Sequence, residues 1–123
     1  MPNDTKVSVS ESILDSIKKL LGIPQELVEF DTDITIHINS YLDVLTQLGV
    51  GPKEGFSISD NKSVWKDFIG DDNQLNMVIT YLFLRVKLVF DPPQNSATYN
   101  AHKERADELE WRLNMKAEHP DAF

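Results

Sequence analysis

One stretch of the chain is far more hydrophobic than the rest. Residues 77–90 read MVITYLFLRVKLVF, and eleven of these fourteen side chains are apolar or aromatic. The stretch is shorter than the roughly 20 apolar residues that cross a bilayer, and Arg85 and Lys87 lie near its end. We therefore expect a buried core element.

Valine, isoleucine, tyrosine and phenylalanine would also suit a strand. When the window is extended back to Asn73, however, the apolar positions fall on one helical face. That face holds Leu75, Val78, Ile79, Leu82, Val86 and Val89, and Phe83 and Phe90 widen it. The pattern predicts a central helix over about 73–90, with an acidic cap at 71–73 and a stop at Asp91-Pro92-Pro93.

Three further amphipathic segments have helical spacing. The first has apolar positions at Ile13, Leu14, Ile17, Leu20 and Leu21, a capping box at Ser8-Val9-Ser10-Glu11, and Gly22 at its end. The second has Ile34, Ile38, Tyr41, Leu42, Leu45 and Leu48, a cap in 31–33, and Gly49 at its end. The third is capped at Asn95-Ser96 and has Tyr99, His102, Ala106, Leu109 and Leu113 in a narrow seam.

Two of these predictions compete with alternatives. Residues 34–38, ITIHI, alternate and are rich in β-branched residues, which locally favours a strand, although the helical period continues to Leu48. The connector 24–31 could hold one helical turn at 25–28.

Residues 49–72 form an unusually long connection with four of the five glycines. Such loops in small domains are usually functional or disordered, and the apolar residues here argue against disorder. We expect a short extended piece at 56–59 and one or two helical turns within 63–69 that pack Trp65 and Phe68.

The predicted fold is therefore all-α: a small bundle of about four main helices around the central helix at about 73–90, with a long loop at about 49–72. At 123 residues we expect one domain over 10–115, an N-terminal arm at 1–9 and a C-terminal tail at 116–123. The absence of cysteine excludes disulfides, and the first residues lack the pattern of a signal peptide, which leads us to expect synthesis in the cytoplasm. The net charge of −8 disfavours tight binding to nucleic acid or to an anionic membrane.

No motif in the chain supports catalysis, a metal or a cofactor. Gly70-Asp71-Asp72 looks like a polymerase metal turn but runs into a helix, and 31–35 lacks the glycine and glutamate of a calcium loop. Residues 49–55 fit no phosphate-loop pattern. The histidines His37, His102 and His119 are scattered, so we expect neither an enzyme nor a bound cofactor.

Aromatic and apolar side chains are the remaining candidates for a partner-binding surface. They are Phe56, Ile58, Trp65, Phe68, Trp111, Met115, His119 and Phe123. For Trp65 and Phe68 simple core packing is the main alternative. Trp111 and Met115 lie away from the seam of their helix, and exposed tryptophan is typical of binding hot spots.

Several stretches together resemble the small all-helical head–tail connector (adaptor) proteins of tailed bacteriophages, also described as possible DNA-packaging proteins. These stretches are SILDSIKKLLG (12–22), FDTDI (30–34), INS (38–40), LTQLGVGP (45–52), WKDFIGDD (65–72), FDPP (90–93) and ELEWRL (108–113). The resemblance covers about 10–115 and leaves the arm and the tail outside.

This resemblance implies a structural protein of the virion at the head–tail junction. Such a protein forms a homo-oligomeric ring, usually of twelve copies, beneath the portal protein. The ring extends the DNA channel and meets the next neck, head-completion or tail-terminator protein, and DNA passes through without sequence-specific binding. The resemblance further implies that the segment 116–123 can reach the portal and that the loop 49–72 contacts neighbours or lines the channel.

Two other functions stay open. A DNA-packaging factor that binds nucleic acid would need a basic patch, and no Lys/Arg cluster is visible in the sequence. A monomeric host-interaction protein would use Trp111 outside particle assembly.

Overall fold

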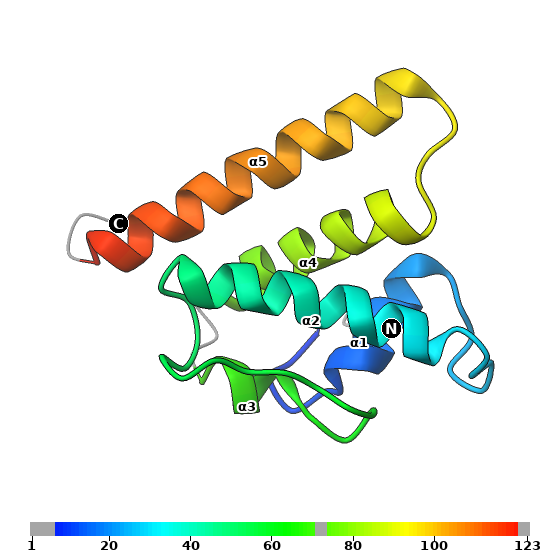
Figure 1. Cartoon of the computed structure of the whole chain (residues 1–123), viewed down its shortest axis with the longest axis horizontal. Coiled ribbons are helices and arrows are strands. Elements are labelled where there is room, and N and C mark those ends of the chain that lie inside the picture. Colours follow the sequence, from blue (N-terminus) through cyan, green and yellow to red (C-terminus); the bar gives the residue numbers. More distant parts are fainter. Residues whose placement is uncertain (1–6, 71–73, 121–123) are drawn as a thin grey trace.

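The fold is a helical bundle, as predicted. In the computed structural model, residues 7–70 and 74–120 are described. They contain the helices α1 (Ile13–Leu21), α2 (Asp31–Gln47), α3 (Trp65–Phe68), α4 (Leu75–Phe90) and α5 (Ser96–Glu118). Figure 1 shows α4 between α5 on one side and α1 and α2 on the other. Within the described ranges no strand forms, and one isolated β-bridge joins Ser12 to Val64.

Helix α4 is the centre of the core, because it packs against α1, α2 and α5. Its buried side chains are Leu75, Val78, Ile79, Tyr81, Leu82, Leu84, Val86 and Leu88. The single apolar face predicted from the sequence was therefore too narrow, and Val89, assigned to that face, is exposed. The cap predicted at 71–73 lies outside the described residues, and α4 stops at Phe90 as expected.

Helix α1 begins later than the sequence predicted. Ser12 is the N-cap and its Oγ accepts a hydrogen bond from the Asp15 N–H at 3.1 Å. The predicted capping pair, Ser8 and Glu11, instead closes a turn before the helix, where Ser8 N–H donates to Glu11 Oε2 at 3.1 Å. At the other end Gly22 adopts a left-handed conformation with φ of 82°, as predicted for a helix-ending glycine.

Helix α2 confirms the helical period over the local strand preference of its first residues. Its N-cap is Phe30, without a side-chain cap bond, so the predicted cap within 31–33 was wrong and those residues form the first turn. The connector before it contains turns at 24–27 and 28–31, not a helical turn at 25–28. Two backbone carbonyls of this connector, those of Gln25 and Leu27, accept hydrogen bonds from Lys18.

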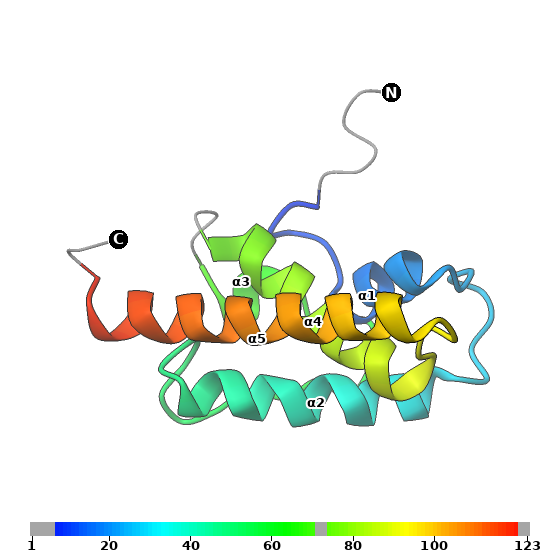
Figure 2. The ribbon, with the colours of Figure 1, turned by 90° about the horizontal axis from the view of Figure 1, so that it is seen from above.

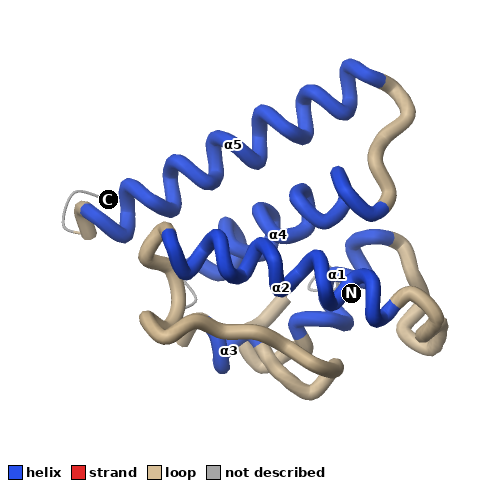
Figure 3. The backbone as a smooth tube through the Cα atoms, in the orientation of Figure 1, coloured by secondary structure: helices blue, strands red, loops and turns tan. Residues whose placement is uncertain are grey.

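The long loop is part of the core. Ile58 N–H donates to Asn39 Oδ1 at 2.8 Å and Asn39 Nδ2 donates to the Ile58 carbonyl at 2.9 Å, which attaches the loop to α2. The predicted helical turn exists as α3, and it buries Trp65, whose indole N–H donates to Ser16 Oγ at 3.0 Å. Figure 3 shows the loop running beneath α2 to α3.

Helix α5 runs the length of the bundle, about 35 Å for its 23 residues. Asn95 caps it through hydrogen bonds from the Ala97 and Thr98 N–H groups, as predicted. It continues to Glu118, so residues 116–118, expected in the tail, are helical. Figure 2, seen from above, shows α5 in front of α4, the helix against which it packs. At the N-terminus, Val7 and Val9, expected in the arm, pack partly against the core.

Candidate functional site: two apolar hollows

The predicted partner-binding residues separate into a buried and an exposed group. Ile58, Trp65 and Phe68 are buried in the core, and Phe56 is half-buried with its ring centre 5.5 Å from that of Phe68. Core packing therefore accounts for the apolar residues of the loop.

The C-terminal candidates lie differently. Trp111 is 59% exposed, Met115 is half-buried and His119 is exposed. Phe123 lies outside the described residues.

Trp111 is exposed because of its helical phase. The seam residues Ala106, Leu109 and Leu113 are buried against the bundle. A residue two positions from Leu109 is turned by about 200° on an α-helix, which directs Trp111 outward. The off-seam placement predicted from the spacing is confirmed.

An ionic network fixes the rotation of α5 on α4. Arg85 Nη2 on α4 lies 2.8 Å from Asp107 Oδ1 and 2.9 Å from Glu110 Oε1 on α5. Tyr81 OH donates to Glu110 Oε1 at 2.8 Å, and the guanidinium of Arg85 stands 5.3 Å from the Tyr81 ring centre. The sequence pattern assigned Arg85 only to the helix end. Its pairing with residues 22 and 25 positions away needed the tertiary structure.

This network shifts the titration of its members. Burial raises the pKa of the Tyr81 hydroxyl above its ordinary value, and the neighbouring Glu110 carboxylate adds to the rise. The pKa of Asp107 is lowered, first by its hydrogen bond from Arg85 and then by the one from Lys103. At neutral pH Asp107 is therefore a carboxylate and Arg85 is a guanidinium cation.

Beside Trp111 lies a hollow of about 420 Å³, which we call the Trp111 hollow. It is lined by Met77, Trp111, Arg112 and Lys116. Two of its four lining side chains, Met77 and Trp111, are apolar, and the two charged ones are cations. Arg112 is also paired with Glu108, four residues earlier on the same helix, at 3.1 Å. The hollow is thus an apolar surface with a basic edge.

A second hollow, of about 390 Å³, lies where the α1–α2 connector meets the first turns of α2 and the long loop. We call it the Val28 hollow. It is lined by Leu14, Val28, Asp31, Thr32, Thr35, Ile36, Ser59, Asp60 and Asn61. Val28 and Ile36 are 64% and 56% exposed, and the charged side chains that line it are both acids.

Sequence reasoning missed the Val28 hollow. Val28 stood in a connector of undecided structure, and Ile36 was read as part of the alternation at 34–38. The sequence did contain one indication: Ile36 does not belong to the apolar stripe of α2, so a helix over these residues leaves its side chain exposed. No pattern in the sequence indicated that Val28 of the connector would lie beside it.

A buried lysine holds the connector in place beside this hollow. The Lys18 side chain is only 1% exposed, and its Nζ donates to the carbonyls of Gln25 and Leu27, both at 2.9 Å. It also lies 2.8 Å from Asp31 Oδ1. Because one cation binds the turn at 24–27 and the first residue of α2, Val28 between them is presented by a fixed backbone.

The comparison with protein-family models decides the family. The model of the family described as "Phage connector protein" matches residues 13–120, which run from the start of α1 to just beyond α5. The chain belongs to the phage connector protein family. No curated protein gave a significant match, and no solved structure did either.

As a phage connector, the chain has a structural role in phage particles, in a family of structural proteins that act with other head and tail proteins. The resemblance to head–tail connectors is confirmed. No helix in the described ranges is long and apolar enough to cross a membrane. Among the same residues no group of three or more His, Asp or Glu could hold a metal ion.

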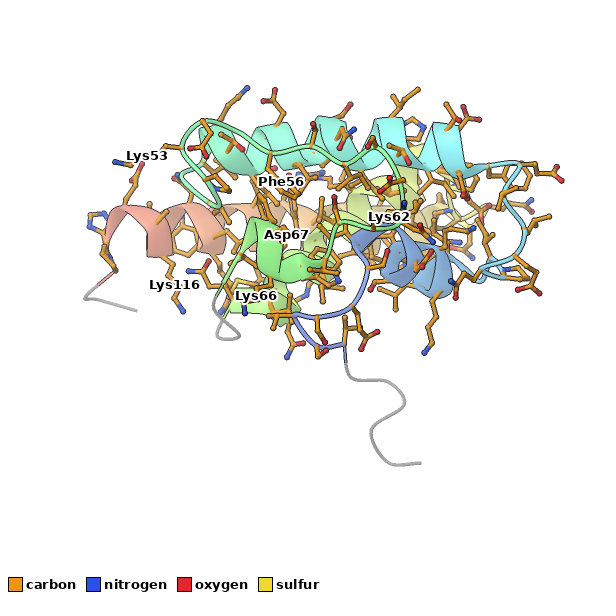
Figure 4. All side chains as sticks on the ribbon, turned by 90° about the horizontal axis from the view of Figure 1, so that it is seen from below. Lys53, Phe56, Lys62, Lys66, Asp67 and Lys116 are labelled. Atoms are coloured by element: carbon orange, nitrogen blue, oxygen red, sulfur yellow. The ribbon has the colours of Figure 1, made fainter. Side chains whose placement is uncertain are left out.

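The lysines of this connector do not form one cluster on the loop face. Figure 4 shows Lys53, Lys62 and Lys66 spread along that face, with Asp67, like Lys66 a residue of α3, among them. Glu54 and Asp60 also belong to this loop and are exposed. Alternating charges give a weak field for a phosphate backbone. The arrangement therefore supports the DNA-binding alternative poorly.

Proposed function

We propose that this connector forms a homo-oligomeric ring of twelve copies beneath the portal protein, at the head–tail junction. The ring extends the channel for the genome and presents its other face to the next neck, head-completion or tail-terminator protein. The single observation that carries this proposal is the family match over 13–120. The exposed Trp111 and the acidic chain support it as secondary observations.

The exposed side of α5 supports contact with a protein partner. A tryptophan that is mostly exposed costs free energy in water, and such residues dominate the binding energy of many interfaces. Trp111 lies on a helix whose rotation is held by Arg85, so its orientation is preformed. Met115 follows on the same helix, and we propose the segment 116–123, with His119 and Phe123, as the portal contact.

The net charge of −8 supports passage of DNA without gripping. A channel lined by part of this charge repels the phosphate backbone, so the genome slides through it.

The test is co-sedimentation with purified DNA-filled, tailless capsids whose portal vertex is free. We expect full-length protein to bind at about one ring per capsid, and a variant that stops after Glu118 to bind weakly. A matched variant, Phe123→Ala, separates the effect of the terminal aromatic from that of the segment. If the full-length protein does not associate with these capsids, the proposal is wrong.

A further inference from the structure

The two hollows have opposite character on opposite ends of one molecule. Figure 1 places the α1–α2 connector at one end of the long axis and the C-terminal end of α5 at the other. The Val28 hollow is apolar with acids, and the Trp111 hollow is apolar with cations. They share no lining residue.

We propose that the Trp111 hollow of one copy docks onto the Val28 hollow of the next copy. The inference rests on the proposed ring and names its subunit contact. Trp111 seats against Val28 and Ile36, and Lys116 faces Asp60 across the contact. The occupant of each hollow is therefore a second copy of this chain.

Exposure and chemistry support this pairing. Val28, Trp111 and Ile36 are the three most exposed large apolar side chains of the described residues, and one docking event buries all three. Removing such side chains from water favours association in proportion to the apolar area that is buried. Scattered apolar residues need no partner, but two hollows that each gather them do.

Charge selects the partner. The carboxylate of Asp60 is exposed, and its Oδ1 accepts a hydrogen bond from the Lys62 backbone N–H at 2.9 Å, which fixes its position. Lys116 makes no ion pair with any described residue, so its ammonium group is available. Two copies of the same hollow would bring like charges together, which is unfavourable, whereas unlike hollows bring opposite charges together.

The geometry of such a contact is head-to-tail. A contact between two different patches leaves one hollow of each copy free, so further copies add until the rotation closes a ring. A contact this small is weak alone, and binding to the portal raises the effective concentration of neighbouring copies. We expect it in concentrated protein and on capsids.

The experiment uses introduced thiols, because the chain contains no cysteine. Ser59→Cys protein and Glu118→Cys protein, which keep the charges of Asp60 and Lys116, are mixed with one of them isotope-labelled. The mixture is treated with a short bismaleimide, both in concentrated solution and bound to tailless capsids. We expect mixed dimers to exceed each homodimer about tenfold. The control is Ala101→Cys, an exposed position on α5 that lines neither hollow.

Charge reversal gives an independent readout. Lys116→Glu in the Glu118→Cys chain should abolish the cross-link to the Ser59→Cys chain, and Asp60→Lys in the Ser59→Cys chain should restore it. All these positions lie on the surface, so circular dichroism should show an unchanged fold.

The outcomes separate this contact from the proposed function. Capsid binding without mixed cross-links overturns the contact and leaves the ring beneath the portal standing. Mixed cross-links in solution without capsid binding support the contact and overturn the neck role. Homodimers formed as readily as mixed dimers overturn the head-to-tail arrangement.

Discussion

The two tryptophans of this connector lie in opposite environments. Trp65 is fully buried and bonded to Ser16 through its indole N–H, whereas Trp111 is 59% exposed on the outer side of α5. Trp65 belongs to the long loop, which looked functional because of its length, and Trp111 belongs to a regular helix. The difference teaches that the apolar residues of a long loop can belong to the core, whereas helical phase can leave a large apolar side chain exposed.

The region around α3 and the outer side of α5 also differ in whether they contribute to the stability of the fold or to contacts with partners. The region around α3 joins the N-terminal turn, the loop and α1 through backbone hydrogen bonds such as Ile13 N–H to the Ser63 carbonyl at 3.0 Å. On the outer side of α5, by contrast, most of the Trp111 side chain is exposed and does not pack in the core. We therefore expect mutations in the first region to change the free energy of unfolding, and mutations in the second to change assembly.

The largest effect is expected for Trp65→Ala. Loss of a fully buried indole leaves a cavity and removes the hydrogen bond to Ser16, and should lower the free energy of unfolding by about 3–5 kcal/mol. Chemical denaturation measures it. Trp65→Phe is the control, since it keeps most of the volume and should cost about half as much or less. A loss below about 1 kcal/mol would contradict the core role of α3.

Gly51→Ala should have the next largest effect. Gly51 has a φ of 88°, and an added Cβ would lie 2.4 Å from Cε1 of the buried Phe68 ring. We expect a loss of about 2–3 kcal/mol from backbone strain and displacement of the ring. Gly55→Ala is the matched control, because its φ is 96° but nothing lies within 4 Å of the added atom. Equal losses at both positions would show that strain alone acts.

As the pH falls, we expect α5 to lose its ion pairs before the packing of α3 changes. Hydrogen bonds first from Arg85 and then from Lys103 lower the folded pKa of Asp107 from its ordinary value. Arg105 and then Arg112 lower the pKa of Glu108 in the same way. A carboxylate with a lowered folded pKa stabilises the fold above its unfolded pKa, and this contribution is lost as pH falls through the folded value.

Stability should therefore decline below about pH 4, and the decline should be smaller in Asp107→Asn. Denaturation midpoints measured from pH 7 to pH 2 test this prediction. An identical decline in Asp107→Asn would show that other carboxylates are responsible.

Trp111→Ala should have the smallest effect on stability and a large one on assembly. Its side chain is mostly exposed, so the free energy of unfolding should change by no more than about 0.5 kcal/mol. Association with tailless capsids should be lost. Tyr99→Ala, at a partly exposed position near the other end of α5, is the control for a surface aromatic. Normal capsid association of Trp111→Ala would favour the monomeric host-interaction alternative.

Local rules were enough for most of the secondary structure. The apolar period of α2, the cap at Asn95, the left-handed Gly22 and the stop before Pro92 each depend on residues within about one helical turn. The outward direction of Trp111 is also a local property, because it follows from the angle between neighbouring positions on one helix. This part of the candidate site could therefore be predicted.

The first residue of α1 and the buried surface of α4 could not be predicted from neighbouring residues alone. Ser8 and Glu11 satisfied a capping pattern, yet α1 begins after Ser12, because the chain before it bonds to residues 63–66. The width of the buried surface of α4 was underestimated for the same reason. Helix α5 covers the side that carries Tyr81 and Leu84, and no periodicity within α4 can indicate that neighbour.

By itself the sequence determined an all-helical chain with a central apolar helix, an acidic surface and an outward tryptophan, since each follows from composition or from contacts between near neighbours. Only the tertiary structure decided that the long loop belongs to the core. It likewise brought Val28 and Ile36 into one hollow, and allowed one buried lysine to hold the connector beside it. Burial and ion pairing depend on which segments meet in space, and the pattern within a single helix does not indicate which segments those are.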